Sequence, residues 1–405
     1  MLNNYREINR PLGRRLERST GAGSRRPATQ PSICESLEPR QFLSVTPAIS
    51  PDQSSTLPVT VGPHQHAQFT DAEGNSDIFS LSGPGTATIT FAGTDLATTV
   101  VKGGVAVGGT SIGVSSISIT GTNRHTSIVF ALAKHTTAHG ALPVGSLTTN
   151  GAVGALTGNI DVTGALTIGG TLGKVAVSGL DGGTSTPTSL TAASIGSLSV
   201  LGNLGEIVTV SGDIGKVVVR GNVTGSISGA LITSLTVGGN VTGSTIALAQ
   251  PLIQRHSDLG KLTVSGTVST TTIQAGGNIG PVAVGALSNS SIEAGITLSG
   301  GSGLPTTPDE FTSRATLSSV KSKTTASTDI AAFTVGKLAL GSLTTSNDGV
   351  PFGIAGATVA QVTGIASITG RKFNIKKLNN QALVTAALVK LGITGPGVDF
   401  TIVIV

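Results

Sequence analysis

A short phrase recurs along the chain from Leu142 onward, and it constrains the fold more than any other feature. Its common form is apolar, Gly, any residue, apolar, any, apolar, any, Gly, Asn or Asp, apolar, as in IGKVVVRGNV at Ile214. The apolar positions alternate with a period of two, which is the period of a strand with one buried face, and the glycines mark turns at its ends. The phrase therefore predicts short strands separated by Gly turns.

The spacing of the phrase indicates how these strands are arranged. GNVTGS occurs at Gly221 and again at Gly239, 18 residues apart, and the other copies step by elastic intervals near multiples of nine or ten. Repeats of about 20 residues built from strands and Gly turns are typical of stacked coils. We therefore predict an all-β fold, a right-handed parallel β-helix (β-solenoid).

Stacked coils place equivalent positions above one another, about 4.8 Å apart. Inward aliphatic stacks are expected from Val217, Val219, Leu235 and Val237. The Asn or Asp that follows a corner glycine is predicted to belong to a ladder, and Asn222 and Asn240 are expected to stack with their side-chain amides bonding along the axis. The predicted ladder positions are Asn203, Asp213, Asn222, Asn240 and Asn278.

Two alternatives explain the pattern less well. An array of β-sandwiches would also show short strands and turns at similar spacing. A disordered low-complexity chain would not sustain the apolar alternation or a positive mean hydropathy. Charged residues make up 11% of the chain, it has no Trp and one Tyr, and its apolar content is mostly aliphatic, which suits a narrow interior.

The chain is divided into five segments on this basis. Residues 1–45 form an Arg-rich leader that is predicted to be disordered, residues 46–62 a linker, and residues 63–140 a β-rich module or the N-terminal cap of the solenoid. The repeats occupy 141–370, and 371–405 form a C-terminal cap. In this cap NNQALVTAALVKLG predicts a helix that ends at Gly392.

Charge, cysteine and hydropathy exclude several classes of function. Residues 1–40 hold eight Arg and four Glu, so the remainder has 17 basic and 16 acidic residues and is almost neutral. A neutral body argues against nucleic acid as a partner. Cys34 is the only cysteine, so the body forms no disulfide and binds no cysteine-ligated metal. No apolar run is long enough to suggest a transmembrane segment.

The leader carries the most specific motif. LEPRQFL, at Leu37, Glu38, Pro39, Arg40, Phe42 and Leu43, follows an Arg-rich stretch that lacks the apolar core of a secretory signal. It resembles the LEPR-XLL motif of large, repetitive extracellular and surface proteins of the planctomycete type, with Phe42 where that family usually has Leu. The resemblance covers about one tenth of the chain. It implies that residues 1–45 direct export to an extracellular or cell-surface location.

Metal and catalytic motifs are weak. Asp71, Glu73, Asn75 and Asp77 alternate in DAEGNSD and could collect oxygens around Ca²⁺, but they fail the EF-hand template, and a solvated turn is favoured. Ser111 in GTSIG matches a nucleophile elbow, yet such a match is expected by chance in a chain this rich in Gly and Ser. We predict no catalytic residues, no cofactor and no resident metal.

The expected function is therefore that of an exported structural or adhesive surface protein without catalytic activity. Its expected partners are extracellular matrix, cell envelope, polysaccharide or further copies of itself. The alternative is a polysaccharide-active β-helix enzyme, a lyase or hydrolase, or a glycan-binding module. Converging carboxylates in a cleft would favour the enzyme, because glycosidic bond cleavage uses such pairs.

Overall fold

The computed structural model describes residues 55–133, 140–182, 188–249, 257–297 and 303–405. Within these ranges 31 strands join one mostly parallel sheet, and the remaining regular elements are the helix α1 (Gln381–Leu391) and the 3-10 turn η1 (Pro308–Glu310). The all-β prediction is confirmed.

The first six strands pair mainly in an antiparallel manner. β1 with β4, β2 with β3, β3 with β6 and β4 with β5 are antiparallel, whereas β5 and β6 also pair in parallel with strands that follow them. β1 lies inside the stretch 46–62 that was expected to be a linker, so part of that stretch belongs to the sheet. The six are β1 (Ser55–Val61), β2 (His66–Asp71), β3 (Ser76–Ser82), β4 (Thr86–Val101), β5 (Gly104–Thr120) and β6 (Ser127–Leu132).

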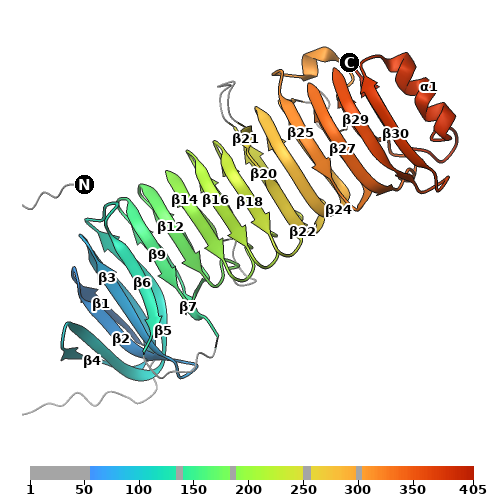
Figure 1. Ribbon diagram of the computed structural model, residues 1–405. Coiled ribbons are helices and arrows are strands. Elements are labelled where there is room, and N and C mark those ends of the chain that lie inside the picture. Colours follow the sequence, from blue (N-terminus) through green and yellow to red (C-terminus); the bar gives the residue numbers. More distant parts are fainter. Residues whose placement is uncertain (1–54, 134–139, 183–187, 250–256, 298–302) are drawn as a thin grey trace, which may run out of the picture. The chain divides into compact units, whose positions relative to one another are not determined.

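Beyond β6 the chain runs repeatedly through three stacks of parallel strands, and we call each passage a coil. Successive strands of the first stack lie side by side in Figure 1. The first stack contains β9 (Val153–Gly158), β12 (Thr171–Val177), β14 (Ser194–Val200), β16 (Ile214–Val219), β18 (Ile232–Val237), β21 (Ser257–Leu259) with β22 (Leu262–Ser269), the start of β24 (Asn278–Ala294), β25 (Thr316–Lys321), β27 (Thr334–Leu343) and β29 (Thr358–Ala366), to which β30 (Lys372–Leu378) adds antiparallel.

The second stack is short, and the third resembles the first. The second contains β7 (Leu142–Val144), β10 (Ile160–Val162), single bridges at Leu180, Leu204 and Val223, β19 (Val241–Thr242) and parts of β22, β24, β26, β27 and β29. The third contains β8 (Leu147–Thr149), β11 (Leu166–Ile168), β13 (Ser189–Ala192), β15 (Ile207–Val210), β17 (Ile227–Gly229), β20 (Thr245–Leu248), β23 (Thr272–Ala275), the end of β24, β26 (Thr324–Ala332), β28 (Phe352–Gly356) and β31 (Phe400–Ile404).

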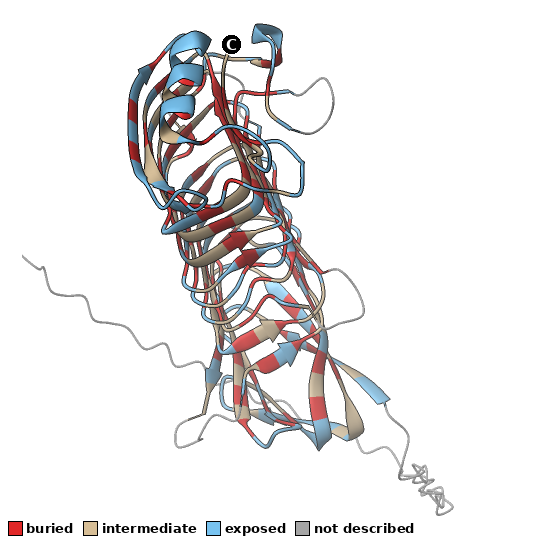
Figure 2. Ribbon diagram, turned by 90° about the vertical axis from the view of Figure 1, so that its right-hand side faces the viewer, coloured by how far each residue is buried: buried red, intermediate tan, exposed pale blue. Residues whose placement is uncertain are grey.

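The interior follows the register that the phrase predicts. Val217 pairs with Leu235 and Val219 with Val237 across β16 and β18, and all four side chains are fully buried. One aliphatic cluster continues from Val59 to Ile402. Buried and exposed residues alternate along the strands in Figure 2. The predicted inward stacks are therefore confirmed, and each coil buries its apolar side chains against the coils next to it.

Aromatic side chains pack at the two ends of the described body. Phe69 and Phe91 pack edge to face with ring centroids 4.9 Å apart, and Phe352 and Phe400 do so at 5.7 Å. The middle coils have aliphatic interiors instead. The interior of the described body is therefore aliphatic in its middle coils and includes packed aromatic rings at both ends.

Helix α1 packs against β30 and β31, as expected for a C-terminal cap. The Oδ1 atom of Asn380 accepts a hydrogen bond from the Ala382 amide at 2.8 Å, and Val384 and Leu388 are buried. Gly392 ends the helix with a φ of 70°. That left-handed conformation favours glycine, and it explains why the predicted end of the helix is confirmed.

Candidate functional site

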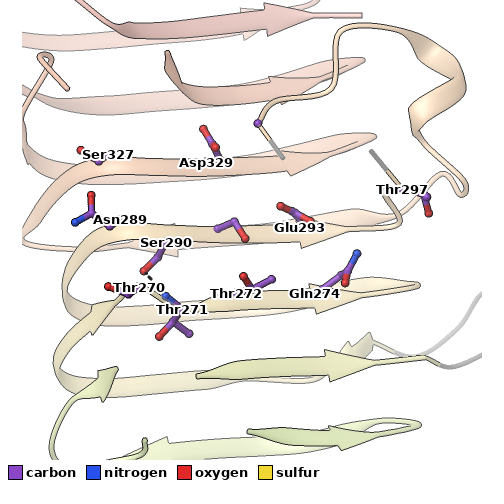
Figure 3. Close-up of a pocket in the computed structure, with 12 residues that line it drawn as sticks. Thr270, Thr271, Thr272, Gln274, Asn289, Ser290, Glu293, Thr297, Ser327 and Asp329 are labelled. Atoms are coloured by element: carbon purple, nitrogen blue, oxygen red, sulfur yellow. Dashed lines mark hydrogen bonds between the residues drawn. The ribbon is translucent and has the colours of Figure 1, made fainter. Parts of the chain in front are cut away.

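The third stack carries a polar hollow near β23, β24 and β26. The hollow has a volume of about 570 Å³, and Figure 3 shows its lining side chains on successive strands. Gln274 on β23 pairs with Glu293 on β24, and Ser291 on β24 pairs with Asp329 on β26. The outward side chains of three successive coils therefore form its floor.

Glu293 and Asp329 are the two carboxylates of the hollow. The Glu293 side chain is only 9% exposed, and burial raises its pKa, with the charge of Asp329 adding to the rise and the Ser291 hydroxyl opposing it. Burial also raises the pKa of Asp329, although its Oδ1 atom accepts a hydrogen bond from the Gly353 amide at 3.0 Å. Both groups therefore hold a proton more readily than exposed carboxylates do.

One wall of the hollow comes from an excursion of the chain after β24. Ile296 forms an antiparallel bridge with Phe311, and Ile296 packs with Ala331 and Ala355 in a small apolar cluster separate from the interior. Thr297 lies on this excursion beside the hollow. The excursion thus covers part of a stack face that other coils expose, and it deepens the surface next to Glu293.

The opposite end of the hollow is a corner with unusual backbone. Thr270, Asn289 and Ser327 have φ values of 49°, 47° and 45°, and all three line the hollow. Non-glycine residues rarely adopt this left-handed conformation, and a β-branched Thr does so at a cost of about 1–3 kcal/mol. The same left-handed backbone conformation occurs on three successive coils, so contacts in the folded protein must stabilise it.

Those contacts include a column of buried hydroxyls, one residue after each strained position. The Thr271 hydroxyl donates to the Ser269 carbonyl and the Ser290 hydroxyl to the Ser288 carbonyl, both at 2.8 Å. The Ser290 Oγ also accepts a hydrogen bond from the Thr271 amide at 3.2 Å. These hydroxyls add a second hydrogen bond to carbonyls that also accept from backbone amides, the Ser269 carbonyl from Gly243 and the Ser288 carbonyl from Thr270.

The lining chemistry suits a neutral, hydroxyl-rich ligand. The lining residues are Thr, Ser, Asn, Gln and Gly together with Glu293 and Asp329, and none is basic or aromatic. An anionic ligand would meet two carboxylates without a compensating cation, which is unfavourable. Paired carboxyls, one of them protonated, are the groups that hydrolyse glycosidic bonds.

A second group of carboxyls lies between the second and third stacks. Glu206 is fully buried, and burial raises its pKa to about 7 against an opposing Thr188 hydroxyl, with the charges of Asp161 and Asp181 contributing further. Burial and the neighbouring Asp181 raise the pKa of Asp161 to about 6. In the described ranges, no three His, Cys, Asp or Glu side chains are arranged to hold a metal ion.

The predicted calcium candidate is the turn between β2 and β3, whose tip, Ala72 to Gly74, is exposed as expected of a solvated turn, whereas the residues beside the tip are buried. Asp71, Asn75 and Asp77 are buried, and both Asp71 carboxylate oxygens accept hydrogen bonds from Asn75, at 2.6 Å from its amide and 2.7 Å from its side chain. Glu73 is exposed. Burial, followed by the Asp71 charge, raises the pKa of Asp77 to about 7.

The structure divides the predicted ladder between two corners. Asn203, Asn222 and Asn240 follow one another at the corner after the first stack: the Asn203 Oδ1 accepts from the Asn222 amide, and the Asn222 Oδ1 accepts from the Asn240 amide, both at 2.9 Å. Side chains thus bond to backbone, and the expected bonding between side-chain amides does not occur there. Asp213 and Asn278 stand at the corner before the first stack, where the Asn278 Oδ1 accepts from the Thr316 amide.

The recurring phrase gives no indication that Glu293 and Asp329 lie close together. The two positions are 36 residues apart and the excursion lies between them, so no fixed repeat length relates them. The targeting motif, Leu37 to Leu43, lies outside the described residues.

Comparison with family models, with curated proteins and with solved structures finds no match. No helix among the described residues is both long and apolar enough to cross a membrane.

Proposed function

We propose that the protein is an exported, non-catalytic surface scaffold with an adhesive role, built as a right-handed β-solenoid. The observation that carries this proposal is the single hydrophobic cluster that continues from Val59 to Ile402. Each coil is supported by its neighbours, which stiffens the stacks, and the outward positions stay free for contacts with matrix, envelope or polysaccharide.

The destination in this proposal rests on the leader. LEPRQFL and the Arg-rich stretch before it resemble the address segment of LEPR-XLL surface proteins. In this proposal the leader directs export and takes no part in the stacks, whose described strands lie after β6. Targeting and folding are therefore separable in this proposal.

Replacing Leu37 to Arg40 with alanines tests the targeting role. We expect the variant to fold as the parent does and to be lost from the cell surface, with accumulation inside the cell, as measured by surface labelling and fractionation. The matched control replaces four residues of the adjacent stretch, Ser44 to Pro47, with alanines. Equal surface levels of the motif variant and the parent would contradict the proposal.

A second candidate function is supported by the hollow at Glu293 and Asp329. Here the protein would cleave a neutral polysaccharide, with a protonated Glu293 as general acid and Asp329 as general base. The raised pKa of Glu293 is the property that such an acid needs near neutral pH.

The release of reducing ends from soluble neutral polysaccharides separates the two functions. The scaffold proposal expects no release by the parent protein. The enzymatic candidate expects release that falls by about 100-fold or more in Glu293→Gln and is unchanged in Glu73→Gln, since Glu73 is an exposed carboxylate in the turn between β2 and β3. A parent that releases nothing removes the enzymatic candidate.

A further inference from the structure

The outward face of the first stack carries a row of exposed lysines in register. Lys174 on β12 and Lys216 on β16 both pair with Ser197 on the strand between them, and Ser234 follows Lys216. Further along, Ser319 pairs with Lys337, and Gln361 separates Lys337 from Lys376. The lysines of the row are Lys174, Lys216, Lys261, Lys337 and Lys376, and all are exposed.

The register places these cations at a regular spacing. Lys261 continues the row, because the pairs Ile232–Leu259 and Leu235–Leu262 flank it. Adjacent strands lie about 4.8 Å apart, so lysines on every second strand lie about 9.6 Å apart. Only the interval from Lys261 to Lys337 is longer, since β24 and β25 contribute Pro281 and Ser319.

The lysine row has no acidic counterpart on its own face. Strands β12, β14, β16, β18, β22, β25, β27, β29 and β30 contain no Asp or Glu. Asp258 lies in the short strand β21 of this stack, where it is buried and accepts a hydrogen bond from the Gly277 amide, and Asp213 stands at the corner before β16. No lysine of the row forms a salt bridge with a described residue. The positive charge of this face is therefore available to an external anion.

Short polar side chains fill the positions between the lysines. Ser197, Ser234 and Ser319 offer hydroxyls, and Gln361 offers an amide, so each can exchange hydrogen bonds with a hydroxyl-bearing ligand. The neighbouring outward row contains Ala176, Ser199, Val218 and Thr236 on successive strands of the same stack. A chain lying along the stack would meet cations and hydroxyls in alternation.

We propose that the lysine row binds an extended acidic polysaccharide that carries one anionic group per disaccharide. A disaccharide of an extended β-linked chain is about as long as two strand spacings, or about 9.6 Å, so successive anions can meet successive lysines. The proposal deepens the adhesive role proposed above, because it names the partner class of that role.

Two observations favour a glycan over nucleic acid. Double-stranded DNA carries one charge per about 1.7 Å of its axis, which is far denser than the lysine row. Single strands bind through bases stacked on aromatic side chains, and the row and the serines between its lysines include none. A sparse, regular charge with hydroxyl partners matches a sparsely charged polysaccharide better.

Binding of the full chain to immobilised hyaluronan, which has one carboxylate per disaccharide, tests the proposal. The variant is Lys174→Ser/Lys216→Ser/Lys261→Ser, because serine already occupies this row on alternate coils. Three exposed ion pairs of about 0.5 kcal/mol each correspond to a loss of affinity of about tenfold. The loss should shrink as salt is added. The matched control, Lys102→Ser/Lys323→Ser/Lys390→Ser, removes the same charge from exposed positions elsewhere and should keep the parent's affinity.

A second pair of measurements tests the spacing itself. Ser197→Lys/Ser234→Lys halves the interval between cations, so its affinity should rise more for polygalacturonate, with one carboxylate per monosaccharide, than for hyaluronan. An unchanged ratio of the affinities for the two polymers would overturn the spacing argument.

Two further outcomes would overturn the proposal as a whole. Equal losses of affinity in the triple variant of the row and in the control triple variant would show that net charge alone acts. Binding of double-stranded DNA as tight as that of hyaluronan would assign the face to nucleic acid.

These outcomes are independent of the targeting test. A purified protein that binds hyaluronan through the row but reaches the surface without the leader motif would refute the address and leave the partner intact. A protein that depends on the leader motif to reach the surface but does not bind hyaluronan would refute the partner and leave the targeting role intact. Melting curves of both triple variants, expected to match the parent because the lysines are exposed, exclude loss of folding as the cause.

Discussion

The first and third stacks belong to the same coils and share one interior, yet their outward faces differ in charge and burial. The first stack presents exposed lysines between short polar residues. The third presents Glu293 and Asp329 in a hollow that the excursion after β24 deepens. The lysines are exposed, whereas Glu293 is buried, and burial disfavours the charge on its carboxylate. In a coil, the inward positions hold the fold together and the outward positions are free to acquire different chemistry.

The largest expected effect comes from a change in the interior that both stacks share. Val219 is fully buried on β16, between Val200 and Val237 of the adjacent coils. Val219→Asp places a carboxylate among aliphatic side chains, and it should lower the free energy of unfolding by several kcal/mol. Urea denaturation would measure this loss, with Val218→Asp, a half-buried outward neighbour, as the control. Equal effects at the two positions would contradict the assigned register.

A smaller effect, dependent on pH, should come from the buried carboxyl of Glu206, which lies between the second and third stacks. The pKa of Glu206 is raised to about 7 in the folded protein, so the folded state binds a proton more tightly than the unfolded state does. The stability this provides is complete below about pH 4 and is lost as the pH rises through about 7. Glu206→Gln should therefore stabilise the protein by about 1–2 kcal/mol at pH 8 and flatten the pH dependence.

Thermal unfolding between pH 4 and pH 8 measures this contribution. Lys216→Gln, on the exposed face of the first stack, should leave the pH dependence unchanged, because Lys216 is not among the groups that shift the pKa of Glu206. If Glu206→Gln and the parent lose stability in parallel as the pH rises, the carboxyl is not the group that responds.

The smallest effect is expected at the corner that joins the first stack to the second. Asn222→Ala removes the acceptor of the Asn240 amide, a bond at an exposed site, and should cost about 0.5–1 kcal/mol. Asn222→Asp keeps the acceptor oxygen and should lie close to the parent. Since Asn222 bonds the backbone of residue 240, Asn222→Ala and Asn240→Ala should add to within about 0.5 kcal/mol.

A double-mutant cycle with urea denaturation tests that additivity. The sequence-based expectation of bonded side-chain amides required a coupling of at least about 0.5 kcal/mol. A coupling of that size would restore the earlier expectation and contradict the side-chain-to-backbone bonds. A loss in Asn222→Asp as large as in Asn222→Ala would show that the acceptor oxygen is not what stabilises the corner.

Sequence patterns a few residues long predicted the inward positions of the strands and the end of the helix. The alternation in IGKVVVRGNV and ITSLTVGGNV placed Val217 and Leu235 inward, and they pair as expected. The helix and its end at Gly392 were predicted from the segment NNQALVTAALVKLG and the glycine that ends it. The hollow escaped prediction, because Glu293 and Asp329 become neighbours only after the excursion has been accommodated.

By itself the sequence determined an all-β chain with an aliphatic interior, Gly and Asn corners and a capping helix, because alternation and turn chemistry act over a few residues. Only the tertiary structure decided which outward side chains share a face. The number of residues between equivalent strands varies, and insertions change it further. Lysines far apart in sequence therefore fall into one row, and Glu293 and Asp329 line the same hollow. Backbone pairing between coils sets that register, and the outward residues take no part in it.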